Sequence, residues 1–205
     1  PWVDAIIQAA MGQNEAHNIR LVQGSHIVTR KLYDHDRAYI FQNADGRIIF
    51  TIPYEEDFTL VGTTDQDFDG DPADAAITEA ETQYLLSAAS EYFKRPLAAD
   101  DIVWSYSGVR PLFDDGASKA QEATRDYVLK VEGDKDEPAV LNGFGGKITT
   151  YRVLSEEVLE KIERRLGARG SRWTGDKPLP GGDFPVDGLA ALEEELQRSV
   201  PELDA

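Results

Sequence analysis

Between residues 20 and 63 the sequence is a series of short segments rich in β-branched and aromatic residues. Such segments favour β-strands, because these side chains pack well on a pleated, half-buried surface. Asp45-Gly46 lies between two of the segments, and Asp-Gly is typical of a tight hairpin turn. Strands joined by tight turns pair antiparallel, so this region predicts an antiparallel sheet. We expect its strands at residues 21–29, 38–42, 47–53 and 58–63.

Helical periodicity replaces this pattern elsewhere in the chain. Thr78-Glu79-Ala80-Glu81 matches a capping box and predicts a helix over 78–93. Apolar residues recur every four positions from Leu154 to Leu166, and Gly167 follows as a C-cap, which predicts a second long helix. The other expected elements are helices at 2–11 and 189–200, strands at 102–112, 125–131 and 139–144, and a turn at 132–137. Together they predict an α+β fold with a mixed or mostly antiparallel sheet.

The order of these elements divides the chain into three parts. Residues 1–143 hold the strands, 144–167 form a glycine turn and helix, and 168–205 begin with a proline- and glycine-rich linker. The first residue is Pro rather than Met, and no signal peptide follows it, so we expect a piece of a longer protein.

Composition excludes several classes of function. The chain carries 21 Lys and Arg against 38 Asp and Glu, a net charge of −17, so we expect no nucleic-acid partner. It has no Cys, which removes disulfides and thiolate catalysis, and its three His are not spaced like metal ligands. No apolar run approaches the roughly 20 residues that span a bilayer. We expect the chain itself to be soluble, and the lack of Cys fits a reducing compartment such as the cytoplasm.

A glycine turn before the second long helix is the first candidate for chemistry. Gly145 and Gly146 precede Lys147 at the predicted helix start, where free amides and the helix dipole favour an anion. Lys147 is expected in the first helical turn, where a cation is unfavourable unless an anionic ligand binds nearby. A plain glycine turn with a solvated lysine is equally compatible with these residues.

Two arginines and a histidine are further candidates. Arg110 is expected at the end of a strand, where Pro111 stops the pairing and directs the arginine toward a sheet edge, and Arg125 opens the next strand. With Lys147 they would form a cationic pocket for phosphate, although a single surface arginine more often forms an ion pair. His26 lies in mid-strand, where a hydrogen-bonded core histidine is the common case, but its pKa range suits acid–base catalysis.

Residues 65–70, Asp-Gln-Asp-Phe-Asp-Gly, imitate the start of a calcium loop. Position 12 of such a loop would be Ala76 instead of Glu, and the segment follows a strand instead of a helix. We therefore expect no metal site, and a calcium-responsive binding module is the non-catalytic alternative.

Five stretches follow one another in a fixed order: IRLVQGSHIV (19–28), GTTD (62–65), DIVWSYSGVRPL (101–112), TRDY (124–127) and FGGKITTYR (144–152). As an ordered set they resemble the FAD-dependent glycerol-3-phosphate dehydrogenases of the aerobic, quinone-linked kind. The resemblance implies that 1–143 is a substrate-binding domain, that 144–167 faces the flavin, and that 168–205 begins a C-terminal helical domain.

The resemblance also implies a reaction and a location. In this family sn-glycerol 3-phosphate is oxidised to dihydroxyacetone phosphate, with hydride passing to FAD N5 and electrons going on to a quinone, and the enzyme is peripheral to the inner membrane. The Gly-x-Gly-x-x-Gly fingerprint of FAD binding is absent from these 205 residues, so the chain alone is expected to be inactive. A related FAD-dependent amine or amino-acid oxidase is the other enzyme interpretation. The oligomeric state is left open.

Site residues follow from the matching stretches. The resemblance implies that Arg110, Arg125 and Lys147 bind the substrate, with Arg110 also catalytic, that Thr63 lines the same pocket, and that His26 accepts the proton. It implies a flavin contact at the backbone of the glycine turn and helix start, which comprises Gly145, Gly146, Lys147, Ile148 and Thr149.

Overall fold

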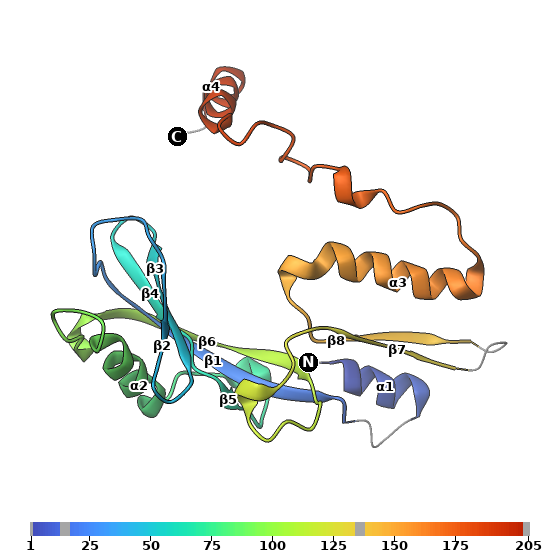
Figure 1. Ribbon diagram of the computed structural model, residues 1–205, viewed down its shortest axis with the longest axis horizontal. Helices are drawn as coiled ribbons and strands as arrows, with labels where there is room; N and C mark the ends of the chain where they lie inside the picture. The colour runs from blue at the N-terminus through green and yellow to red at the C-terminus, as the bar shows by residue number, and fades with distance from the viewer. Residues whose placement is uncertain (1, 13–16, 134–137, 203–205) are drawn as a thin grey trace. The chain divides into compact units, whose positions relative to one another are not determined.

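The computed structural model describes residues 2–12, 17–133 and 138–202. The chain divides into two compact units, Pro1–Leu154 and Ser155–Ala205. All the strands of the described chain lie in the first unit (Figure 1).

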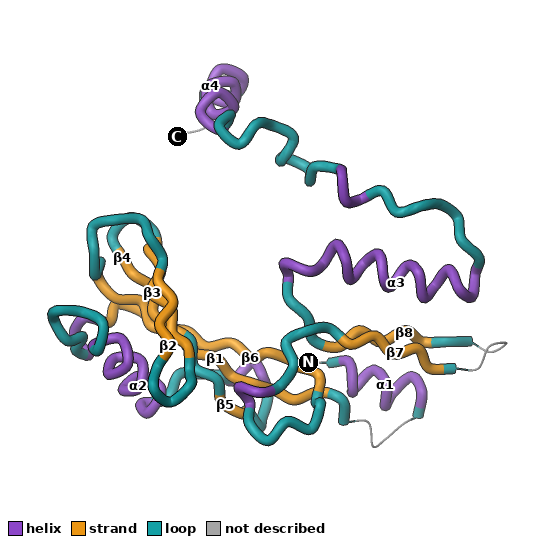
Figure 2. The backbone as a smooth tube through the Cα atoms, in the orientation of Figure 1, coloured by secondary structure: helices purple, strands orange, loops and turns teal. Residues whose placement is uncertain are grey.

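A six-stranded sheet is the centre of the first unit (Figures 1 and 2). Its two longest strands, β1 (Ile19–Arg30) and β6 (Ile102–Phe113), pair along nearly their whole length. On its other side β1 pairs first with β5 and then with β4, and β3 and β2 follow. These strands are β2 (Tyr39–Gln42), β3 (Ile48–Tyr54), β4 (Phe58–Gly62) and β5 (Gln66–Asp67). All these pairs are antiparallel, which confirms the predicted α+β fold with a mostly antiparallel sheet.

Helix α2 (Glu79–Ser90) packs on one face of this sheet. The predicted capping box is present, because Thr78 Oγ1 accepts from the Glu81 amide at 3.2 Å and Glu81 Oε2 accepts from the Thr78 amide at 2.9 Å. Side chains alternate along a strand, so the odd-numbered residues of β1 face this helix. The main core lies between helix and sheet and consists of Ile27, Ile49, Val61, Leu85, Leu86, Ala88, Ala89 and Leu97.

A smaller apolar cluster lies on the opposite face. Val22 of β1 and Leu112 of β6 pack there against Ala120 and Ala123. These alanines belong to the segment 114–127, which contains the 3-10 turn Ala120–Glu122. The cluster therefore anchors this segment over the even-numbered residues of β1 and β6.

Helix α1 (Val3–Met11) and a hairpin of β7 (Val128–Glu132) and β8 (Val140–Phe144) complete the strand-bearing part of the first unit. The turn expected at 132–137 lies largely outside the described residues. Strand β7 begins three residues later than predicted, so Arg125 lies in the preceding loop and does not open the strand.

The glycine turn after β8 differs from the expected direct helix start. Gly145 and Gly146 have positive φ angles of 65° and 97°, a region that favours glycine. The 3-10 turn Ile148–Thr150 follows, closed by the amide and hydroxyl of Thr150 donating to the Lys147 carbonyl. Helix α3 (Tyr151–Leu166) begins after it, so Lys147 has an extended backbone and does not lie in the first helical turn.

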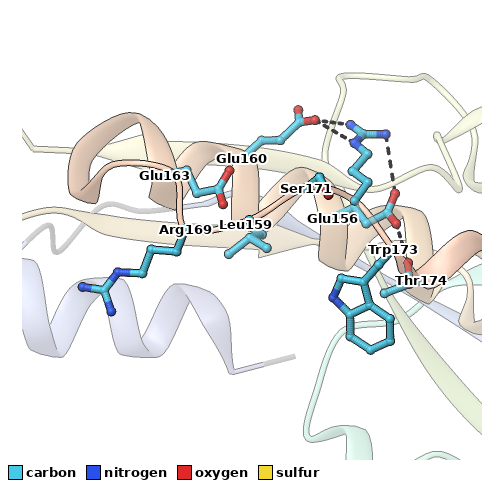
Figure 3. A pocket seen from close by; sticks show the side chains of 10 residues that line it. Glu156, Leu159, Glu160, Glu163, Arg169, Ser171, Trp173 and Thr174 are labelled. Atoms are coloured by element: carbon cyan, nitrogen blue, oxygen red, sulfur yellow. Dashed lines mark hydrogen bonds and ion pairs between the residues drawn. The ribbon is translucent and has the colours of Figure 1, made fainter.

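The second unit contains most of α3, the irregular stretch expected at 168–186, and α4 (Leu189–Ser199). After α3 the chain turns back along the helix, where Arg172 lies 3.5 Å from Glu156 Oε2 and also pairs with Glu160. The returning segment and α3 enclose a shallow pocket beside Leu159 and Trp173 (Figure 3). Among the residues described, no helix has the length and apolarity needed to cross a membrane.

Candidate active site

The candidate site lies on the sheet face opposite α2, where the even-numbered residues of β1 and β6 point. Arg110 is opposite Val22 in the register, and its guanidinium lies over Gly24 of the neighbouring strand. A Cβ at position 24 would overlap that guanidinium. Glycine at 24 therefore makes room for the Arg110 side chain to lie flat across the strand.

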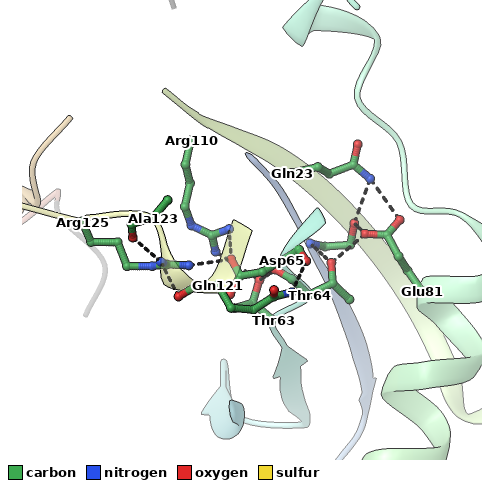
Figure 4. Close-up of polar contacts among 10 residues, drawn as sticks. Gln23, Thr63, Thr64, Asp65, Glu81, Arg110, Gln121, Ala123 and Arg125 are labelled. Carbon is green, nitrogen blue, oxygen red and sulfur yellow. Dashed lines mark hydrogen bonds and ion pairs between the residues drawn. The ribbon is translucent and has the colours of Figure 1, made fainter. Parts of the chain in front are cut away.

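Two arginines converge on one carboxylate in this site (Figure 4). Arg110 Nη1 and Arg125 Nη2 each lie 3.1 Å from Asp65 Oδ1. Arg110 Nη2 also donates to Thr63 Oγ1 at 3.1 Å. Both arginine side chains are about one-third exposed. Two guanidinium groups thus share a single counter-charge and keep a net positive charge beside an open surface.

Arg125 reaches the site from the segment 114–127. Its Nη1 donates to the backbone carbonyls of Gln121 and Ala123, at 3.2 and 2.9 Å. Gln121 Nε2 donates in turn to the Asp65 carbonyl at 2.8 Å. The segment is therefore fastened to the residues that follow β4, and this fixes the position of Arg125 beside Arg110.

His26 lies on the same face, two residues along β1 from Gly24. Its ring stacks on Tyr106 with 4.9 Å between centroids, and a Cβ at Gly62 would overlap it. Its buried Nδ1 has no hydrogen-bond partner within the ranges that the structure describes. Burial lowers the pKa of His26, and the nearby charge of Arg110 lowers it further, so the ring is neutral at pH 7 and able to accept a proton.

Two cavities meet at the paired arginines. One, of about 370 Å³, is lined by Arg110 and Arg125 together with Thr63, Asp65 and Arg47. The other is lined by the same arginines and by the turn that comprises Gly145, Gly146 and Lys147. Lys147 is half-exposed and lies 3.1 Å from Asp126. The structure thus joins Arg110 and Arg125 through Asp65, places Thr63 in direct contact with Arg110, and places Lys147 on an adjoining wall.

The prediction that Pro111 stops the strand pairing and directs Arg110 toward a sheet edge is wrong. Strand β6 continues to Phe113, and Pro111 pairs with Leu21 in the register. Within the described chain β6 pairs with β1 alone, so it is an edge strand, where the missing proline donor faces away from the ladder. Arg110 consequently points onto the sheet face and not toward its edge.

Asp65 belongs to the candidate site, although its sequence pattern suggested only an imitation of a calcium loop. The carboxylates that imitate a calcium loop bind different arginines, because Asp67 pairs with Arg20 at 2.6 Å while Asp65 pairs with Arg110 and Arg125. No group of three or more potential metal ligands occurs in the described ranges. The available signal was spacing, since Asp65 follows Thr63 by two residues and an extended segment directs both to one side.

Comparison with known proteins identifies the family. Residues 1–152 match the family model described as FAD dependent oxidoreductase. The chain belongs to this family.

Several curated relatives align along most of the chain. A glycerol-3-phosphate dehydrogenase of Pseudomonas aeruginosa is 47% identical over 204 residues, which are 100% of this chain and 40% of the relative. An aerobic glycerol-3-phosphate dehydrogenase of Escherichia coli is 44% identical, covering 91% of this chain and 37% of its own length. A D-erythritol 1-phosphate dehydrogenase of Brucella abortus is also 44% identical, covering 98% and 40%. The chain spans about two-fifths of the length of these relatives.

A solved structure of the family has the same fold. The glycerol-3-phosphate dehydrogenase of Bacillus halodurans, complexed with FAD, superposes with a TM-score of 0.71 at 26% identity. The match covers 97% of this chain and 38% of that one.

Proposed function

We propose that this chain is the substrate-binding part of a flavin-dependent enzyme that oxidises sn-glycerol 3-phosphate to dihydroxyacetone phosphate. The observation that carries the proposal is the pair Arg110 and Arg125, held side by side with one shared carboxylate on a sheet face that also presents a neutral histidine. Membership of a flavin-dependent family and the names of the relatives support the same reaction.

In this proposal the arginines and Lys147 bind the phosphate. Guanidinium groups match phosphate oxygens bidentately, and two of them beside a lysine suit a dianion. Asp65 and Thr63 hold Arg110 in place through contacts of 3.1 Å, so the site is organised before substrate arrives. A neutral polyol offers these cations no anionic acceptor and would bind more weakly.

His26 is proposed as the group that accepts the proton of the substrate's C2 hydroxyl. A general base has to be unprotonated at the working pH, and the lowered pKa of His26 meets that condition. Its Nδ1, which has no hydrogen-bond partner among the described residues, and its position on the same face as Arg110 support this role. Loss of that proton and departure of the C2 hydride together convert the alcohol to the ketone.

The residues present also fit a flavin edge. Gly145 and Gly146 line the second cavity without side chains, which lets a planar ring approach their backbone, and Arg110 and Lys147 line the same space. When bound, FAD supplies the acceptor for the hydride. We assign its contact in this chain to the backbone of residues 145–149.

The proposal extends to the organisation of the enzyme. We assign substrate binding to 1–143, the flavin-facing turn and helix to 144–167, and the start of a C-terminal helical domain to 168–205. A quinone is the proposed final electron acceptor, which would require the full-length enzyme to lie at the inner membrane surface.

An anaerobic visible spectrum of the full-length protein tests the proposal. Addition of sn-glycerol 3-phosphate is expected to bleach the oxidised flavin band, whereas glycerol without phosphate leaves it unchanged. D-erythritol 1-phosphate, titrated in parallel, reports how strictly the site selects a three-carbon chain. Flavin that stays oxidised with both phosphates but bleaches with an amine or amino acid would replace the proposed substrate.

A further inference from the structure

Glu81 on α2 is a buried carboxylate without a cationic partner among the described residues. Its exposed fraction is 0%, and it accepts five hydrogen bonds from neutral donors. Burial alone would raise its pKa, but the bonds from Thr64, Thr78 and Ser25 together hold the pKa below its ordinary value. The group is therefore an anion in the core, fully satisfied by dipoles.

Helix capping does not require all of these bonds. Oε2 accepts from the amide and hydroxyl of Thr78, at 2.9 and 3.0 Å, and these complete the capping box. Oε1 instead points across to the sheet, where it accepts from Ser25 Oγ at 2.7 Å and from Thr64 Oγ1 at 2.6 Å. A buried charge is costly, so these contacts beyond the cap call for a separate explanation.

The contact with Thr64 lies in the middle of the segment that organises the candidate site. Thr64 Oγ1 also accepts from the Ser25 amide at 2.9 Å, so its side chain is held on the α2 side of the sheet. Its neighbours Thr63 and Asp65 point to the other side, where each contacts Arg110 at 3.1 Å (Figure 4). Fixing the middle residue of an extended tripeptide fixes the direction of the two flanking side chains.

We propose that Glu81 is a positioning residue for the substrate site. Through Thr64 it sets the rotation of the segment 63–65, and Thr63 and Asp65 then set the spacing of Arg110 and Arg125. This inference rests on the proposed function, because it assigns a role in binding a phosphorylated substrate. A carboxylate in the core thereby controls the geometry of cations on the opposite face of the sheet.

Steady-state kinetics of the full-length holoenzyme test this role with matched variants. Thr64→Val keeps the side-chain shape but removes both hydrogen bonds of the hydroxyl, and Thr64→Ser restores them. Glu81→Gln keeps the shape and removes the charge. Ser90→Ala is the structural control, because Ser90 Oγ caps the Leu97 amide at 2.8 Å and lies in α2 without contacting the segment 63–65.

We expect Thr64→Val and Glu81→Gln to raise the KM for sn-glycerol 3-phosphate and the Ki for inorganic phosphate about tenfold, with a smaller change in kcat. Thr64→Ser is expected to stay close to wild type in both constants. Ser90→Ala is expected to lower the melting temperature while leaving both constants unchanged. All variants are compared well below their melting temperatures.

A folded Thr64→Val enzyme with wild-type KM and phosphate Ki would overturn the inference. So would a Ser90→Ala enzyme whose constants move as far as those of Thr64→Val at a similar loss of stability. If Glu81→Gln does not fold, the Thr64→Val and Thr64→Ser pair still decides the question. A wild-type holoenzyme that sn-glycerol 3-phosphate does not reduce would refute the proposed function itself, which is a different result.

Discussion

The two faces of β1 carry opposite charges in different surroundings. On the odd-numbered face, Gln23 and Ser25 donate to Glu81, and a buried negative charge is satisfied by neutral donors. On the even-numbered face, the Arg110 guanidinium occupies the space above Gly24 that a side chain would fill. There, two guanidinium groups share the charge of Asp65. The strand thus separates the Glu81 carboxylate, which has no cationic partner in the described part of the chain, from two arginines that share one carboxylate.

This difference indicates where stability and function reside. The α2 side is packed and has its polar groups paired, as expected of a core. The other side keeps two partly exposed arginines and a histidine nitrogen without a partner in the described chain. An anionic ligand would neutralise the arginines on the second side, whereas the packed first side, with its buried carboxylate, offers no binding site for an anion. Truncation of apolar core residues on the α2 side should therefore affect stability, and substitution of the arginines on the other side should affect substrate binding. Glu81 and Thr64 connect the two faces, so their substitution should affect both.

The largest effect is expected from Arg110→Ala in the full-length enzyme. Loss of its charge-assisted hydrogen bonds should lower kcat/KM about a thousandfold, or roughly 4 kcal/mol of transition-state stabilisation. Unfolding free energy should change little, because Asp65 keeps Arg125. Arg95→Ala, which removes an exposed pair with Asp101, is the matched control and should leave kcat/KM unchanged. Unaltered kinetics in Arg110→Ala would remove this residue from the site.

Leu85→Ala tests the other face. Leu85 is fully buried in the main core, so its truncation should cost about 3 kcal/mol of unfolding free energy by creating a cavity. Urea unfolding followed by tryptophan fluorescence measures that loss. In the surviving folded enzyme, the KM for sn-glycerol 3-phosphate should stay at its wild-type value. A large change in KM would show that the two faces are not separable in this way.

Glu81→Gln should show a pH-dependent loss of stability. The pKa of Glu81 is lowered in the folded state, so its contribution is present above the ordinary value of 4.5 and disappears as pH falls through the folded pKa. We expect the variant to be about 1 to 2 kcal/mol less stable at pH 7, and the gap to wild type to narrow below pH 4.5. Urea unfolding across this range measures the gap. A gap independent of pH would mean that the charge is not what stabilises the fold.

The smallest effect concerns the titration of His26. Burial lowers the pKa of its ring below 6.5, and Arg110 lowers it further. NMR titration of the histidine signals should place the His26 midpoint below 6.5, and Arg110→Gln should move it upward while burial still keeps it below that value. His35→Gln identifies the signal of an exposed ring for comparison. A midpoint that does not respond to Arg110→Gln would contradict the proximity of the two charges.

Local signals predicted the elements well, and long-range contacts account for what they missed. The capping box at Thr78 and the alternating strands are encoded within a few residues, and both are present. The proposed positioning role of Glu81 could not be predicted from the sequence, because the capping box already explains a glutamate at that position. Arg125 was a candidate, but the segment 114–127 that places it has no periodicity to read. Its position depends on packing of Ala120 and Ala123 against β1 and β6.

Gly24 and Gly62 have a consequence for how relatives of this chain acquire new substrates. Both positions lie under side chains of the proposed site, so peptide backbone forms the floor of that site. Any larger residue there would displace Arg110 or His26. Divergence toward longer polyol phosphates is therefore expected at the rim, at residues such as Arg47 and Gln121. Mutational libraries confined to the rim should shift substrate chain length, while the floor tolerates almost no variation.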